Sequence, residues 1–160
     1  MKVTVIGIGH IGLPLALTID AETPHQVQAF DVSDIALKQL TIREASFAED
    51  GMQELLATHR VTVTNQIQKS EAYIVTVGTP VTNHFTPDTS AVDDVIWHLF
   101  DNDLMKDSLL VLRSTVPIGY TEGVVERIAM EFGMTLETDY YMAYCPERIA
   151  EGVAIKELKS

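Results

Sequence analysis

Three glycines and one aspartate near the start of the chain have the types and spacing needed to bind a dinucleotide. Gly7, Gly9 and Gly12 form the pattern GxGxxG directly after a short apolar run. The first glycine allows a tight turn, the second lets a pyrophosphate approach the backbone, and the third lets a helix pack on a strand. Asp31 follows a second apolar run, where a carboxylate can accept hydrogen bonds from the hydroxyls of an adenosine ribose. Together these residues predict a dinucleotide site.

The elements that must position these residues alternate between strand and helix. Apolar runs predict strands at residues 3–6, 26–30, 60–64, 72–77, 108–113 and 140–143. Helical periodicity predicts helices at residues 11–20, 34–40, 51–58, 91–100 and 121–132, with Ser33 or Asp34 as an N-cap and Gly133 as a stop. This alternation is typical of an α/β fold, a Rossmann-type doubly wound parallel sheet that places ligands at the carboxyl ends of its strands.

Composition limits the size and the partners of the protein. The 160 residues, 46% of them hydrophobic, are enough for one domain with a core. The formal net charge of −12 argues against nucleic acid or an anionic membrane as a partner. No apolar run is long enough to span a membrane, and the first residues do not resemble a signal peptide, so we expect a cytoplasmic protein. The single cysteine, Cys145, excludes an internal disulfide and fits a reducing compartment.

Five motifs resemble one known family, the UDP-glucose/GDP-mannose dehydrogenases. They are GIGHIGLP at 7–14, Asp31, VGTP at 77–80, STVPIG at 114–119 and CPERIAEG at 145–152. The resemblance implies NAD-dependent, two-step oxidation of the C6 alcohol of a UDP-sugar to a uronic acid, in polysaccharide biosynthesis, by a homo-oligomer. The segment PERIAEG most resembles the corresponding segment in the branch of the family that acts on N-acetylated sugars.

The resemblance also implies roles for individual residues. Thr115 would position a water or a developing oxyanion, and Glu147 would handle the proton. NAD binding would fall to Gly7, Gly9, His10, Ile11, Gly12, Asp31, Gly78, Thr79, Pro80 and Thr115, and substrate binding to Glu147, Arg148, Ile149, Ala150 and Glu151. Two structural alternatives remain: Thr115 could cap the following turn, and Glu147 and Glu151 could form a solvated helix face.

The resemblance further implies that the chain corresponds to the NAD-binding domain, over residues 1–160. The family's linking helix, substrate-binding half and nucleophilic cysteine would lie outside this stretch, so we expect these residues alone to be inactive. Cys145 is not that nucleophile, because it closes an apolar strand, where a buried and unreactive thiol is the common outcome.

The histidines show no pattern that indicates catalysis or metal binding. His10 stands where the family has a tyrosine, and we expect it to be an exposed residue between loop and helix. His25, His59, His84 and His98 lack metal-ligand spacing, so no metal site is predicted.

Two other functions share the glycine turn and the acidic second strand. One is an NAD-sensing regulatory domain, and the other is a hydroxyacid dehydrogenase of the 6-phosphogluconate type. A sensor does not need the hydroxyl loop at 114–119 with paired carboxylates nearby, and the hydroxyacid enzyme would lack the segment at 145–152. Both alternatives therefore rank below the nucleotide-sugar dehydrogenase.

Overall fold

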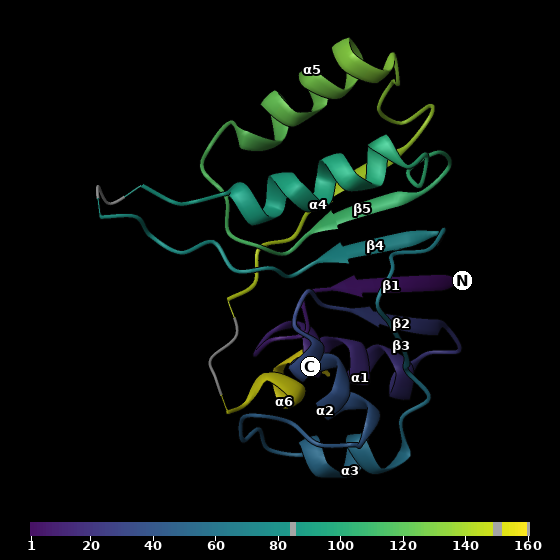
Figure 1. Ribbon diagram of the computed structural model, residues 1–160, viewed down its shortest axis with the longest axis vertical. Helices are drawn as coiled ribbons and strands as arrows, with labels where there is room; N and C mark the ends of the chain where they lie inside the picture. Colours follow the sequence, from purple (N-terminus) through teal and green to yellow (C-terminus); the bar gives the residue numbers. More distant parts are fainter. Residues whose placement is uncertain (84–85, 149–151, 160) are drawn as a thin grey trace.

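The computed structural model describes residues 1–83, 86–148 and 152–159, and within them six parallel strands form one sheet with helices on both faces (Figure 1). The strands are β1 (Lys2–Ile6), β2 (Gln26–Phe30), β3 (Thr62–Thr64), β4 (Ala72–Val75), β5 (Leu109–Leu112) and β6 (Tyr141–Tyr144). The helices are α1 (Gly12–Glu22), α2 (Asp34–Thr41), α3 (Met52–Thr58), α4 (Ser90–Asp101), α5 (Tyr120–Phe132) and α6 (Ala154–Leu158). The predicted doubly wound parallel sheet is confirmed.

The strand order β3-β2-β1-β4-β5-β6 creates a switch point between β1 and β4. The chain first moves outward from β1 to β3, and then returns to place β4 on the free side of β1. Ile6 at the end of β1 is level with Phe30 of β2 and Val75 of β4. The glycine turn therefore leaves the sheet between the loops that follow β2 and β4, which is where doubly wound folds bind ligands.

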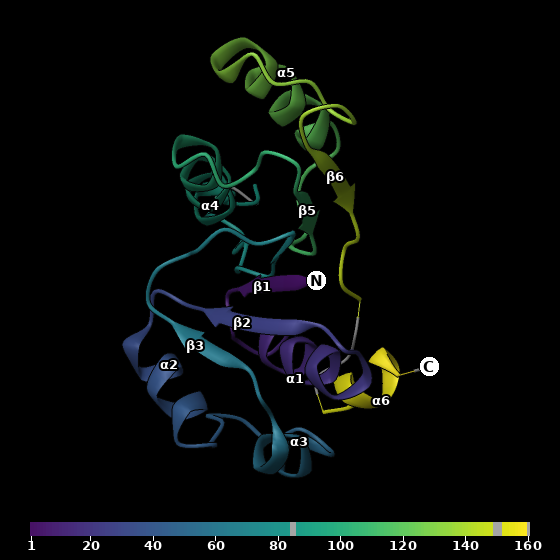
Figure 2. The same ribbon diagram turned by 90° about the vertical axis from the view of Figure 1, so that its right-hand side faces the viewer.

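Alternating side chains of β1 reach two separate cores. Val5 packs into a core with residues of α1, α2 and α3, whereas Ile6 packs into a core with residues of α4 and α5. Figure 2 shows these two groups of helices on opposite sides of the sheet. Because β1 is covered on both faces, its neighbouring residues Val5 and Ile6 are both buried, and the turn that follows has a rigid base.

Several predicted ends agree with the structure. The Ser33 hydroxyl accepts a hydrogen bond from the amide of Ala36 (3.3 Å) and so caps α2. Gly133 ends α5 with a φ of 65°, a left-handed conformation that favours glycine. Within the described residues, no helix is long and apolar enough to cross a membrane.

One helix was missed, and strand β4 ends two residues earlier than predicted. The short α6 packs the buried residues Ala154 and Ile155 near α1, but it has too few apolar positions to show a helical period. Strand β4 ends at Val75 rather than at residue 77, because the next residues turn toward the glycine loop.

The stability of this fold should depend on the protonation of His59. Burial lowers the pKa of the His59 imidazole below its ordinary value, and the charge of Arg43 lowers it further. The unfolded chain then binds the proton more readily, so the free energy of unfolding should fall as the pH drops below about 6.5. When urea unfolding is measured at about pH 7 and about pH 5, the free energy of unfolding should fall less between these two values for His59→Gln than for the unchanged chain.

His98→Gln is the matched control, because His98 is exposed. This variant should keep the full pH dependence. Equal losses of stability in the unchanged chain and in His59→Gln would contradict the prediction.

Candidate functional site

The glycine turn after β1 is built from three glycines with three different constraints. Gly7 has a φ of +91°, and its amide donates to the carbonyl of Phe30 (2.8 Å). A Cβ on Gly12 would lie only 1.7 Å from the Gly7 carbonyl oxygen, so no side chain fits where α1 begins. A Cβ on Gly9 would meet nothing within 4 Å, which leaves the backbone open to a ligand. The turn therefore fits a pyrophosphate at the start of α1.

Thr76 fastens this turn to the neighbouring strand. Its hydroxyl lies 2.6 Å from the Gly7 carbonyl oxygen and 3.0 Å from that of Ile6. The apolar run at residues 72–77 predicted a strand through Thr76 and no role for its side chain. The sequence feature that could have indicated this role is the hydroxyl group of Thr76, which stands in the otherwise apolar run at residues 72–77, just before the loop at 78–80.

The carboxylate of Asp31 lies at the end of β2 and is held by two backbone amides. Its Oδ2 accepts from Ile8 (2.8 Å) and its Oδ1 accepts from Ser33 (2.8 Å). A carboxylate oxygen has more than one acceptor position, so both oxygens can still accept from a ligand. Asp31 therefore orders the glycine turn and remains able to bind ribose hydroxyls.

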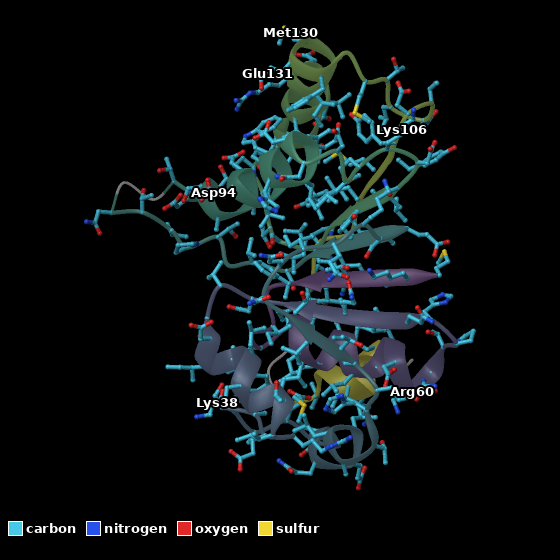
Figure 3. All side chains as sticks on the ribbon, turned by 45° about the vertical axis from the view of Figure 1, so that its right-hand side comes forward. Lys38, Arg60, Asp94, Lys106, Met130 and Glu131 are labelled. Carbon is cyan, nitrogen blue, oxygen red and sulfur yellow. The ribbon has the colours of Figure 1, made fainter. Side chains whose placement is uncertain are left out.

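A cavity of about 580 Å³ opens beside the glycine turn, between β1, β2 and α4. Four of the predicted cofactor-binding residues line this cavity: Gly7, Gly9, Asp31 and Gly78. The rest of the wall had not been predicted, and consists of Ile6, Phe30, Val32, Ile67, Thr76, Val77, Ala91, Asp94, Val95 and His98. Figure 3 labels Asp94 on α4. The walls of this cavity are mostly apolar with a few polar groups, which suits the binding of a planar base.

Three further loops are joined to one another at the same edge of the sheet. The Ser114 hydroxyl after β5 donates to the carbonyl of Val77 after β4 (2.6 Å). The amide of Val116 donates to the Tyr144 hydroxyl at the end of β6 (3.3 Å). Through these contacts the loops that carry residues 78–80, Thr115 and Glu147 have defined relative positions.

The described residues bear on the alternatives for Thr115 and Glu147, although Glu151, the other carboxylate of the expected helix face, lies outside them. The side chain of Thr115 is exposed, and α5 starts from Gly119 without a side-chain cap. Glu147 lies outside any helix, with a side chain only 10% exposed. Its carboxylate forms an ion pair with Arg113, and its amide donates to the Arg113 carbonyl (3.1 Å).

Other predicted residues lie in these loops without lining the cavity. This group consists of His10, Ile11, Thr79, Pro80, Thr115, Glu147 and Arg148, with Gly12 at the start of α1, while Ile149, Ala150 and Glu151 fall outside the described residues. His10 is exposed, as expected, and its ring stacks on Phe47 with centroids 4.1 Å apart.

The expectation that Cys145 is buried was wrong. Cys145 is an exposed free cysteine directly after β6. The reason is topological, since β6 is the last strand of the sheet, and within the part of the chain that the structure describes no further strand pairs with its outer edge.

The two constraints in the glycine turn can be separated by substitution. Gly12→Ala should lower the free energy of unfolding by about 2 kcal/mol or more, because the new Cβ overlaps a backbone oxygen. Gly9→Ala should leave stability nearly unchanged and should weaken dinucleotide binding at least tenfold, because its Cβ occupies the space that the pyrophosphate needs. Urea unfolding and calorimetric titration would measure the two effects. Gly123→Ala in α5, where the new Cβ also meets nothing within 4 Å, is the control. It should leave dinucleotide binding unchanged and should not lower the free energy of unfolding.

Comparisons with known proteins agree with this geometry. The family model described as "UDP-glucose/GDP-mannose dehydrogenase family, NAD binding domain" matches residues 1–160. The UDP-N-acetyl-D-mannosamine dehydrogenase of Pyrococcus horikoshii is 28% identical over 99% of this chain and 39% of its own length. The UDP-N-acetyl-D-glucosamine 6-dehydrogenase of Salmonella typhi is 32% identical over 95% of this chain and 36% of its own length.

A solved structure shares the fold closely. The UDP-N-acetyl-mannosamine dehydrogenase of Staphylococcus aureus superposes with a TM-score of 0.90 and 26% identity, over 99% of this chain and 39% of the other. The chain therefore spans about two-fifths of the length of these relatives. From the glycine turn, the strand order and the match over its whole length, the chain belongs to the UDP-glucose/GDP-mannose dehydrogenase family, as its NAD-binding domain.

Proposed function

We propose that this chain forms the cofactor-binding part of an NAD-dependent nucleotide-sugar 6-dehydrogenase. The reaction is the oxidation of the C6 alcohol of a UDP-sugar to a carboxylate, and the relatives' names favour an N-acetylated sugar. The observation that carries the proposal is geometric. The glycine turn, Asp31, Thr115 and Glu147 all lie in loops at the carboxyl ends of parallel strands, around one switch point.

The residues at this edge suit an extended dinucleotide. The open backbone at Gly9 faces the pyrophosphate, the carboxylate of Asp31 accepts from the adenosine ribose, and the cavity beside α4 takes the adenine. Residues 78–80 and Thr115 line the nicotinamide side. NAD supplies the hydride acceptor there.

Thr115 and Glu147 act on the sugar. The exposed Thr115 hydroxyl positions a water or a developing oxyanion, and the carboxylate of Glu147 accepts a proton. Residues 147–151 contact the nucleotide sugar. Oxidation beyond the aldehyde also requires a thiolate that holds the carbonyl carbon covalently. We propose that this cysteine lies outside residues 1–160.

The setting of the protein belongs to the same proposal. A UDP-sugar and NAD are both metabolites of the cytoplasm, and the absence of a disulfide partner for Cys145 fits that compartment. We infer that the longer protein is a cytoplasmic homo-oligomer that binds neither nucleic acid nor membranes. The negative net charge supports the last two points.

The chain should bind NAD at least tenfold more tightly than NADP. The carboxylate of Asp31 would repel a 2′-phosphate, and the following residues Val32 and Ser33 offer no positive charge. Calorimetric titration with both dinucleotides measures the difference. Asp31→Asn should narrow it and should also weaken NAD binding, because the new NH₂ group faces one of the two amides that the carboxylate now accepts from.

Asp103→Asn is the matched control for charge. Asp103 is exposed on the connection that leads into the start of β5, away from the strand ends that carry the site. Its substitution should leave the preference for NAD unchanged. Tighter binding of NADP by the unchanged chain would contradict the assignment of Asp31.

The 160 residues alone should bind NAD but should not oxidise a UDP-sugar. NADH absorbance is followed after mixing the chain with NAD and UDP-N-acetyl-D-mannosamine, UDP-N-acetyl-D-glucosamine or UDP-glucose. Turnover that survives Cys145→Ala would show that no second half is needed, and turnover abolished by that change would make Cys145 the nucleophile.

The oxidation itself is tested after joining these residues to a substrate-binding half. Such a protein should form two NADH per UDP-sugar, and Thr115→Ala should reduce its turnover by about a hundredfold. Normal NAD binding without any oxidation of the three UDP-sugars would contradict the proposed function.

A further inference from the structure

The ion pair between Arg113 and Glu147 is unusually enclosed. Arg113 directly follows β5, and Glu147 lies three residues after the end of β6. Their side chains are 20% and 10% exposed. The other ion pairs among the described residues each have at least one side chain that is 40% exposed or more, such as Arg127–Glu131 on α5 at 50% and 46%.

Both partners are held in place by their backbones. The strands β5 and β6 pair in parallel register up to Leu112 and Tyr144. Just beyond that point, the Cys145 amide donates to the Leu112 carbonyl (2.8 Å), and the Glu147 amide donates to the Arg113 carbonyl (3.1 Å). The ladder therefore continues past the strands and brings the two side chains together.

The second oxygen of the Glu147 carboxylate also has a donor. Its Oε1 accepts from the amide of Arg148 (2.7 Å), while Oε2 faces the Arg113 guanidinium. These donors can satisfy only an ionised carboxylate well, because a protonated carboxyl has fewer acceptor positions. Enclosure would otherwise favour the neutral acid.

We propose that Arg113 is a positioning residue that holds Glu147 ionised and directed toward the end of β5, ready to accept a proton. This role rests on the function proposed for Glu147. Without the guanidinium, the enclosed carboxylate would lose its positively charged partner and would tend to bind a proton before any substrate arrives. Arg113 therefore acts through Glu147 and does not itself touch the reacting atoms.

The surrounding charges are compatible with this role. Burial lowers the pKa of the Arg113 guanidinium, whereas the nearby Cys145 thiol, when ionised, raises it. An arginine starts from so high a value that it stays charged at neutral pH.

The proposal is tested on the 160-residue chain by NMR, with ¹³C-labelled glutamate carboxyl groups titrated between about pH 3 and pH 8. Glu147 should titrate below the ordinary glutamate value of about 4.3. In Arg113→Met its pKa should rise by at least about one unit, a tenfold increase in proton affinity. Arg113→Lys retains the charge and should restore most of the original pKa.

Arg127→Met is the matched control, because it removes the partner of Glu131 from an exposed pair at the outer end of α5 (Figure 3). This substitution should leave the titration of Glu147 as it is in the unchanged chain. The proposal is overturned if Glu147 of the unchanged chain titrates at or above the ordinary glutamate value, a result that requires no variant. It is equally overturned if a folded Arg113→Met leaves the pKa of Glu147 unchanged.

These outcomes separate the two proposals. A lowered pKa of Glu147 together with no oxidation of any UDP-sugar by the longer protein would leave the role of Arg113 standing and would reject the proposed function. Oxidation of a UDP-sugar with an unshifted Glu147 would do the reverse.

Discussion

The close contact between Gly12 and the Gly7 carbonyl is the constraint on which the site at the carboxyl ends of the strands depends. It brings the start of α1 onto the end of β1 with no room for a side chain. Free amides at the start of the helix then face the ligand, and their partial positive charge favours an anion. The hydroxyl of Thr76, just after β4, donates a hydrogen bond to the same carbonyl. This hydrogen bond therefore links the glycine turn to the strand on the other side of the switch point.

This arrangement explains how a chain with a net charge of −12 can bind an anionic dinucleotide. The glycine turn supplies backbone donors, whose direction is set by the fold and does not depend on mobile cationic side chains. The two carboxylates at this edge are held in different ways. Asp31 accepts from two amides and remains accessible, whereas Glu147 is enclosed and faces Arg113. This difference suits the roles proposed for them, recognition of hydroxyl groups by Asp31 and acceptance of a proton by Glu147.

Much of the fold could be predicted because its signals are local. Apolar runs marked the strands, Ser33 and Gly133 marked helix ends, and the motifs fell at the ends of strands. The failures have a common cause. The short α6 gains its stability from packing near α1, and the exposure of Cys145 follows from the edge position of β6. Neither the packing of α6 nor the exposure of Cys145 can be read from the residues that flank them in the sequence.

By itself, the sequence determined the glycine turn and the acidic end of β2, since both depend on spacing within some 25 residues. Only the tertiary structure decided which distant side chains meet. Thr76 reaches a carbonyl 69 positions away, and α4 supplies one wall of the cavity beside the turn. Arg113 meets Glu147 because β5 and β6 are neighbours in parallel register. Such contacts follow from strand order and register, which the local periodicity of a chain does not encode.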